Sequence, residues 1–198
     1  MHPYLTEEDV RTRVFIMCAI LAVGSGWELS QFLIGLPFSV PWWIETPSVL
    51  GFFGFYMWLY NNFLWKIWPF SNLEWFCIPN LNGKWKVKIT SSYKGFEEVI
   101  PASATIRQTA TKISIALRTD NSSSYSTSAA LLKTEHLSTY ELKYHYTNYP
   151  NPEAVNTMEI HHGSAWLGIE KNNDHMNGDY FTGRGRQQYG KLCFLKKK

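Results

Sequence analysis

The stretch GKWKVKIT, residues 83–90, alternates polar and apolar side chains. Lysines stand at positions 84, 86 and 88, and Trp85, Val87 and Ile89 stand between and after them. Successive side chains of a β-strand point to opposite faces, so this pattern predicts a strand with one face buried and the other in water. The same period of two recurs at about residues 112–118, 139–146, 158–162 and 178–184.

Turn-forming segments such as TDNSS, NYPNP and KNND separate the alternating stretches. Short antiparallel strands joined by such turns predict an all-β, antiparallel, up-and-down (lipocalin-like) barrel of eight strands, because an open sheet would leave edges to protect. An outer-membrane barrel is excluded by the charges on the outward sides of these strands, including Lys86, Glu141 and Lys143. A lysine at the middle of a membrane costs about 2–4 kcal/mol.

Two long apolar stretches precede the strands, at about residues 14–36 and 49–65. Each approaches the roughly 20 residues that a helix needs to cross a membrane. The segment PFSVPWWIETP between them has three prolines to stop a helix and two tryptophans suited to a membrane interface. The sequence therefore predicts a transmembrane hairpin over 1–68, a linker over 69–80 and a barrel over 81–198. A buried soluble hairpin and a cleaved signal peptide are less favoured, since apolar character resumes after AVGSG and a second run follows.

Charge and cysteine use predict the orientation of the hairpin. Arg11 and Arg13 flank the first apolar stretch and Lys66 ends the second, whereas the loop between them carries only Glu45. The positive-inside rule then places both termini in the cytoplasm. The three cysteines, at positions 18, 77 and 193, are widely spaced, which suits a reducing compartment and argues against disulfides and zinc sites.

Polar and small residues recur on one face of each apolar stretch. Gly24, Glu28, Gln31 and Gly35 share one helical face, and Gly51, Gly54, Trp58 and Asn61 repeat the arrangement. Small residues let helices approach closely, and a glutamate inside a membrane must face protein or water. We expect this face to associate helices, or else to pack the hairpin against itself. The candidate oligomerisation residues are Gly24, Glu28, Gln31 and Asn61.

One register of the predicted barrel places polar and aromatic side chains where a purely structural barrel would hold aliphatic ones. Aromatic rings stack on nucleobases, arginine binds phosphate, and hydroxyls or an imidazole supply further polar contacts. An ordinary core role remains the commoner one for any single tyrosine, but a buried arginine without an anionic partner is costly. The candidate ligand-binding residues are Arg184, Tyr180, Thr182, Tyr144, Tyr146, His162, Gln108 and Ser126.

The strand-rich part is basic, with sixteen Lys or Arg against eleven Asp or Glu from Pro69 onward. This excess fits either anionic lipids near the barrel or an anionic ligand, and charge alone leaves both open. Enzyme motifs are missing: HHGSAW is not G-x-S-x-G, and neither H-E-x-x-H nor a glycine-rich loop opening a helix occurs. His161 and His162 are adjacent, so on a strand they face opposite ways. We therefore expect no catalysis, no metal and no cofactor.

Several segments, taken in order, carry a resemblance to a known family. They are LNGKW (81–85), IRQTATKISIALRT (106–119), SSYSTSAAL (123–131), LKYHYTNYP (142–150), HHGSAWLGI (161–169) and NGDYFTGRGRQQYGKL (177–192). With the two apolar stretches, they resemble the SMODS-associated two-transmembrane, β-strand-rich effectors of CBASS anti-phage systems. The resemblance covers the whole chain, and its most specific element is G-x-Y-x-T-x-R at Gly178, Tyr180, Thr182 and Arg184.

The resemblance implies a role in antiviral defence. In that family a CD-NTase makes a cyclic di- or oligonucleotide during infection, the β-barrel binds it, and the protein oligomerises and disrupts the bacterial inner membrane so that the cell dies. The implied partners are this nucleotide, the lipid bilayer and further copies of the chain, with no DNA or RNA. A membrane-tethered lipocalin-like carrier of an apolar ligand and a ligand-free membrane scaffold are the alternative functions.

Overall fold

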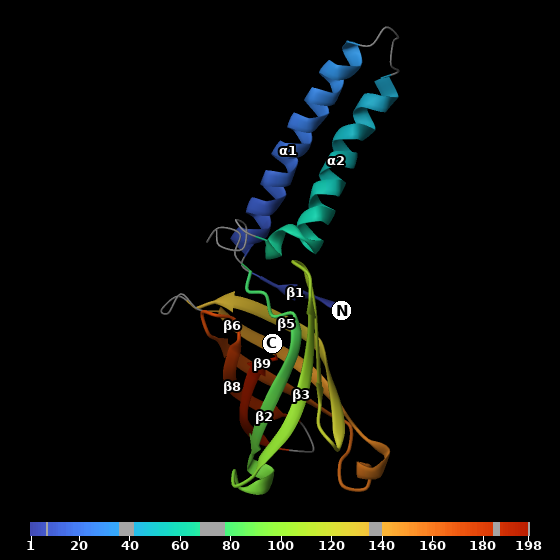
Figure 1. Cartoon of the computed structure of the whole chain (residues 1–198). Helices are drawn as coiled ribbons and strands as arrows, with labels where there is room; N and C mark the ends of the chain where they lie inside the picture. The colour runs from blue at the N-terminus through green and yellow to red at the C-terminus, as the bar shows by residue number, and fades with distance from the viewer. Residues whose placement is uncertain (7, 36–41, 68–77, 135–139, 184–186, 198) are drawn as a thin grey trace. The chain divides into compact units, whose positions relative to one another are not determined.

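The computed structural model describes residues 1–6, 8–35, 42–67, 78–134, 140–183 and 187–197 of the 198-residue chain. The chain divides into two compact units. Met1–Glu7 and Pro79–Lys198 form a β-barrel unit, and Glu8–Ile78 form a helical unit (Figure 1). The first residues of the chain thus cluster with the barrel, whereas the sequence analysis grouped them with the hairpin. Most of the expected linker, 69–80, lies outside the described residues.

Eight strands follow one another around the barrel, and each pairs antiparallel with its neighbour in sequence. The last strand returns to the first of the eight and closes the sheet. These strands are β2 (Gly83–Ser91), β3 (Val99–Gln108), β4 (Lys112–Arg118), β5 (Ser122–Lys133), β6 (Tyr140–Pro150), β7 (His161–Ile169), β8 (His175–Thr182) and β9 (Tyr189–Lys196). The antiparallel up-and-down order predicted from the alternation is therefore present.

The closed sheet has nine strands rather than the predicted eight. The additional strand is β1 (His2–Leu5), which pairs antiparallel with β4 and parallel with β5. The strands β4 and β5 pair directly over Ala116–Arg118 and Ser123–Tyr125, and β1 lies between them where it pairs with residues 112–113 of β4 and 129–130 of β5. The prediction missed β1 because its four residues are too few for a period to be read, and only contacts distant in sequence fix it as a strand.

One end of the barrel is filled by a solid core. Trp85 and Phe194 are fully buried there, with their ring centroids 6.2 Å apart in an edge-to-face arrangement. Gln108 is also buried, and its side chain is fully engaged. Its Oε1 accepts from the Leu81 amide at 2.9 Å, and its Nε2 donates to the Pro79 carbonyl at 3.1 Å and to the Tyr4 hydroxyl at 3.2 Å. Gln108 therefore hydrogen-bonds both chain segments at this end of the barrel: Tyr4 in β1, and residues 79–81 before β2.

The helical unit consists of α1 (Glu8–Ile34), α2 (Trp42–Asn62) and the short 3-10 helix η1 (Leu64–Lys66). The two long helices run antiparallel, and one seam joins them. Ser25 and Tyr56 share a hydrogen bond of 2.6 Å between their hydroxyls, and a Cβ at Gly26 would lie 2.6 Å from the Val49 Cγ2. Within the residues described, Val10–Ile34 is the stretch that is long and apolar enough to cross a membrane by length and composition. The same test does not select α2, so the second span stays a prediction.

The predicted stripe of small and polar residues lies away from this seam. Glu28 and Gln31 are exposed, and a Cβ at Gly24, Gly51 or Gly54 would meet no atom within 4 Å. These five residues therefore do not pack α1 against α2. Gln31 stands near the end of α1 and Asn61 near the end of α2, so in an antiparallel pair they lie toward opposite ends.

Candidate functional site

A cavity of about 360 Å³ occupies the half of the barrel interior opposite the solid core. The C-terminal halves of β2, β4, β6 and β8 and the N-terminal halves of their antiparallel neighbours line it. The chain enters the barrel at Pro79, just before β2, so the cavity lies at the far end of the strands from that entry. One half of the interior is thus a packed core, and the other half is this cavity, which is called the cup below.

Three of the four tyrosines that line the cavity lie on β6 and β8. Tyr144 and Tyr146 follow one another in the inward register of β6, with ring centroids 6.1 Å apart, and Tyr180 comes from β8. Burial raises the pKa of Tyr144, and the neighbouring Tyr146 raises it further. Burial and the nearby Tyr180 likewise raise the pKa of Tyr146. Both phenols are therefore neutral hydrogen-bond donors, and neither hydroxyl has a partner within the described part of the chain.

Two glycines on the inward register make room for these rings. A Cβ at Gly163 on β7 would lie 2.4 Å from both Cζ and Oη of Tyr146. A Cβ at Gly190 on β9 would lie 2.8 Å from Cε1 of Tyr180 and 2.0 Å from the Thr90 carbonyl oxygen. Real Cβ atoms do not approach other atoms this closely, so the tyrosine positions depend on the missing side chains.

Other polar groups in the wall are held by one another. The Ser124 hydroxyl donates to Asn148 Oδ1 at 2.8 Å, and Asn148 Nδ2 donates to Met158 Sδ at 3.3 Å. The Thr182 hydroxyl donates to the Gln188 carbonyl at 3.2 Å and accepts from the Gln188 amide at 2.9 Å. Thr182 thus lines the cavity, and its hydroxyl also joins the two ends of the β8–β9 connection.

The charges in the described lining are acidic. Glu98 and Asp120 reach the cavity, and the structure places no Lys or Arg among the described lining residues. An anionic ligand would need a cation from another part of the chain. Arg184, the leading candidate from the sequence, lies outside the described residues, two positions beyond Thr182 in the chain.

The structure brings some of the predicted site residues together and separates others. Tyr144, Tyr146, Tyr180 and Thr182 all line the cavity. Gln108 lies at the opposite end in the hydrogen-bond network described above. Ser126 holds β1 in place instead, because its hydroxyl bonds His2 Nε2 at 2.7 Å and accepts from the Ile115 amide at 2.9 Å.

His162 is on the outer side of β7, so its expected inward position is wrong. Its Nδ1 lies 3.0 Å from the Thr147 hydroxyl, and the side chain is exposed. The expectation extended the alternation of Met158 and Ile160, but β7 begins only at His161. Counted back from the buried Leu167, the inward histidine is His161, and His161 does line the cavity.

The sequence analysis also missed Ser91, Asn148 and Gln188 as lining residues. Asn148 continues the inward register of Tyr144 and Tyr146 by one more step, so that register contained the signal for it. Ser91 likewise continues the register of Val87 and Ile89. Gln188 precedes β9, where no alternation could have marked it.

A closed up-and-down barrel with a cavity of this kind has room for a small molecule, as receptor and carrier barrels do. Residues 76–196 match the family model described as Cap15, cyclic dinucleotide receptor domain. The chain is also 32% identical over 150 residues to CD-NTase-associated protein 15 of Yersinia aleksiciae, which covers 75% of this chain and 71% of that protein. The chain therefore belongs to the Cap15 family of CBASS effectors, and the resemblance found in the sequence is confirmed.

The space that Gly163 leaves for Tyr146 is tested by substitution. Gly163→Ala should lower the melting temperature of the full-length protein in detergent by about 5 °C, because an added methyl in a filled site costs about 1–3 kcal/mol. Gly168→Ala on the same strand is the control, since its Cβ would meet only the Asn177 carbonyl oxygen at 3.6 Å. Equal melting temperatures for the two variants would mean that the Tyr146 ring does not depend on Gly163.

Proposed function

We propose that this chain is an anti-phage effector whose barrel binds a cyclic nucleotide made by a CD-NTase in the cavity. The observation that carries the proposal is that Tyr144 and Tyr146 line the cavity and that their hydroxyls have no hydrogen-bond partner among the described residues. A hydroxyl that faces the cavity without a protein partner is free to bond a ligand that enters. The volume of about 360 Å³ falls in the range of small-molecule sites. Membership of a family described as cyclic dinucleotide receptors gives the ligand class.

Each group of the cavity has a role in this proposal. Tyr144, Tyr146 and Tyr180 offer rings for base stacking and hydroxyls for polar contacts, and Asn148 and Ser124 offer donors and acceptors for base edges. Arg184 supplies the positive charge for phosphate that the described lining lacks. The carrier function is less favoured because the matching family is described as cyclic dinucleotide receptors. The protein acts as a receptor and not as an enzyme.

Ligand binding is proposed to lead to oligomerisation and to disruption of the bacterial inner membrane. Both α1 and α2 would span the membrane with the termini in the cytoplasm, as the positions of Arg11, Arg13 and Lys66 favour. The exposed stripe with Glu28 and Gln31 would then join hairpins to one another. If all hairpins cross the membrane in the same orientation, Gln31 of one chain lies at the same depth as Gln31 of another chain. It would therefore contact that Gln31 and not Asn61.

The proposed function is tested by thermal shift of the full-length protein in detergent. The panel contains cyclic di-GMP, cyclic di-AMP, cyclic GMP-AMP and a fatty acid. A true ligand at a hundredfold excess over its Kd should add about 2.7 kcal/mol of stability. Stabilisation by the fatty acid alone would favour a carrier, and no stabilisation by any compound would favour a scaffold.

The tyrosine hydroxyls are tested by a Tyr144→Phe, Tyr146→Phe double variant. It keeps both rings and removes two hydrogen-bond donors, so it should fold normally and bind the stabilising nucleotide about tenfold more weakly in calorimetric titration. Tyr149→Phe is the matched control, because Tyr149 is exposed on the outer register of the same strand. Unchanged affinity in the double variant would place the nucleotide outside the cavity.

The phosphate role of Arg184 has its own test. Arg184→Ala should weaken nucleotide binding by at least about tenfold, because it removes a charge-assisted contact, while the barrel still folds. An Arg107→Ala, Arg118→Ala variant is the comparison, since both side chains belong to a groove on the outer face of the barrel. A loss of affinity in that variant, with none in Arg184→Ala, would locate the phosphates in the outer groove.

The membrane step is tested in liposomes that carry the full-length protein. A Glu28→Leu, Gln31→Leu variant should bind nucleotide normally and lose nucleotide-triggered dye leakage, because the polar groups that join hairpins are gone. Val23→Leu, at another exposed position of α1, is the control and should leak like the wild type. Leakage by the double variant at the wild-type rate would remove the stripe from the mechanism.

A further inference from the structure

We propose that Cys193 is a nucleophilic thiol on the outer face of the barrel and a site of modification by small anionic disulfides such as glutathione disulfide. His175 acts on this thiol as a general base, and Glu170 positions His175. The inference goes beyond the proposed function, because it concerns the outside of β8 and β9 and needs neither a ligand in the cavity nor a membrane. The residues that carry it all belong to the barrel unit.

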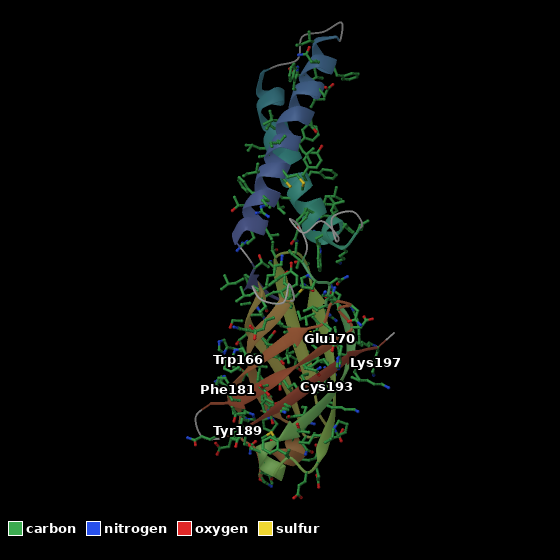
Figure 2. The ribbon with its side chains drawn as sticks, turned by 90° about the vertical axis from the view of Figure 1, so that its left-hand side faces the viewer. Trp166, Glu170, Phe181, Tyr189, Cys193 and Lys197 are labelled. Carbon is green, nitrogen blue, oxygen red and sulfur yellow. The ribbon has the colours of Figure 1, made fainter. Side chains whose placement is uncertain are left out.

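Glu170, His175 and Cys193 form a row of hydrogen bonds. The Nδ1 atom of His175 lies 2.5 Å from Glu170 Oε1, and the Nε2 atom of the same ring lies 3.3 Å from Cys193 Sγ. The imidazole therefore stands between the carboxylate and the thiol. Figure 2 shows Glu170 and Cys193 on the same face of the barrel. A nucleophile within reach of a base that a third group orients is the arrangement by which proteins activate thiols and hydroxyls.

The carboxylate fixes which nitrogen of His175 carries the proton. A carboxylate oxygen only accepts hydrogen bonds, so Nδ1 donates to Glu170 and, in the neutral ring, Nε2 keeps a free lone pair. Asn177 Nδ2 lies 3.4 Å from Nδ1, which is a longer contact than that of the carboxylate. The lone pair of Nε2 faces the Cys193 thiol. His175 is thus held in the form that accepts the thiol proton.

The same geometry does not suit a metal ion. Glu170 and Cys193 contact opposite nitrogens of the His175 ring, so the three groups do not converge on one point. Within the described part of the chain, no group of three or more His, Cys, Asp or Glu side chains is placed to hold a metal. The row therefore fits the activation of a nucleophile better than ligation.

The alternation of β9 places the sulfur at the surface. Leu192 and Phe194 are buried, so Cys193 between them faces outward, and it is partly exposed. Its ladder partner on β8 is Asn177, and the next residue in that row, on β7, is Gly168, which has no side chain. A small molecule can therefore reach the sulfur from solvent.

Two lysines on β2 give the sulfur a positive surrounding. Lys88 is the β2 partner of Cys193, and Lys86 stands two residues before it on the same outer face. On the other side of β2, the β3 partners of these lysines are Pro101 and Ser103. No carboxylate thus stands opposite either lysine, and neither forms an ion pair within the residues described.

The carboxylates near the row already have partners. Glu170 is bonded to His175, and Asp179 stands opposite Lys191 in the β8–β9 ladder. The unmatched charge beside Cys193 is therefore positive and comes from Lys86 and Lys88. Cations beside a thiol stabilise the negative charge on sulfur, and they also attract a disulfide that carries carboxylates. This charge favours an anionic disulfide over a cationic one.

The proposed reaction is a thiol–disulfide exchange. Cys193 Sγ passes its proton to His175 Nε2 and attacks one sulfur of the disulfide. A new S–S bond to Cys193 forms as the S–S bond of the disulfide breaks, and the leaving thiolate takes the proton from His175. One thiol and one disulfide thus become one mixed disulfide and one thiol. No further oxidant or reductant is needed.

The base is tested by incubating the full-length protein in detergent with glutathione disulfide. Mass spectrometry of the intact protein measures the rate of adduct formation, and peptide mapping separates Cys193 from Cys18 and Cys77. His175→Ala should slow the reaction at Cys193 by about tenfold or more, because the general base is lost, and added imidazole should restore part of the rate. His145→Ala, at an exposed histidine of β6, is the control and should react like the wild type.

The positioning role of Glu170 is tested in the same assay. Glu170→Ala should slow adduct formation, because Nδ1 is no longer held as a donor. Glu170→Gln should recover part of the rate, since its amide oxygen can still accept from Nδ1. A purely structural effect would not follow this order in variants that melt at the wild-type temperature.

The charge is tested with two disulfides of opposite sign. A Lys86→Gln, Lys88→Gln variant should react about fivefold more slowly with glutathione disulfide and faster with the cationic disulfide cystamine, because attraction to anions is lost. Lys112→Gln, at the start of β4, is the control and should leave both rates unchanged.

Three results would overturn the inference. They are equal rates at Cys193 in the wild type and in His175→Ala, a rate at Cys193 no higher than in the free peptide GKLCFLK of residues 190–196, and equal loss with both disulfides in the lysine variant. Should His175→Ala unfold the barrel, His175→Gln replaces it, with the same loss expected. The assay contains no nucleotide and no vesicles, so its outcome is separate from that of the thermal-shift test.

Discussion

The pairing of β9 with β2 closes the sheet, and the rest of the barrel depends on that closure. A closed sheet has an inside, so the inward register of every strand faces a common interior. The same closure gives every strand an outward register that faces solvent or a partner. Each segment of two or three residues therefore contributes to the interior and to the outer surface.

The interior is divided along the strands. Toward Pro79, large apolar side chains such as Trp85 and Phe194 fill the space completely. Toward the other end, the inward positions change to serine, asparagine and tyrosine, and glycines such as Gly163 and Gly190 remove side chains altogether. The cup is thus a consequence of sequence changes within single strands, and no added loop or domain creates it.

The sequence predicted the parts of this structure that depend on local pattern. Alternation identified most strands and placed Tyr144, Tyr146, Tyr180 and Thr182 correctly in the interior. It failed for His162, because the alternation was extended through residues before the strand begins. It also failed for β1, whose place between β4 and β5 is set by partners more than a hundred residues away. Register within a strand is a local property, whereas strand limits and insertions depend on the closed sheet.

The inward or outward position of a residue on its strand also did not distinguish structural polar residues from those that face the cavity. Gln108 and Tyr146 are both inward and both buried, and the sequence assigned them the same role. Their hydrogen bonds distinguish them, because Gln108 is fully engaged by Leu81, Pro79 and Tyr4, whereas the Tyr146 hydroxyl has no partner among the described residues. A satisfied buried group stabilises the fold, and an unsatisfied one is stabilised only by a molecule that enters. Among the described residues, the Gln108 side chain is therefore part of the packed core, whereas the Tyr146 hydroxyl faces the cavity and is open to a ligand.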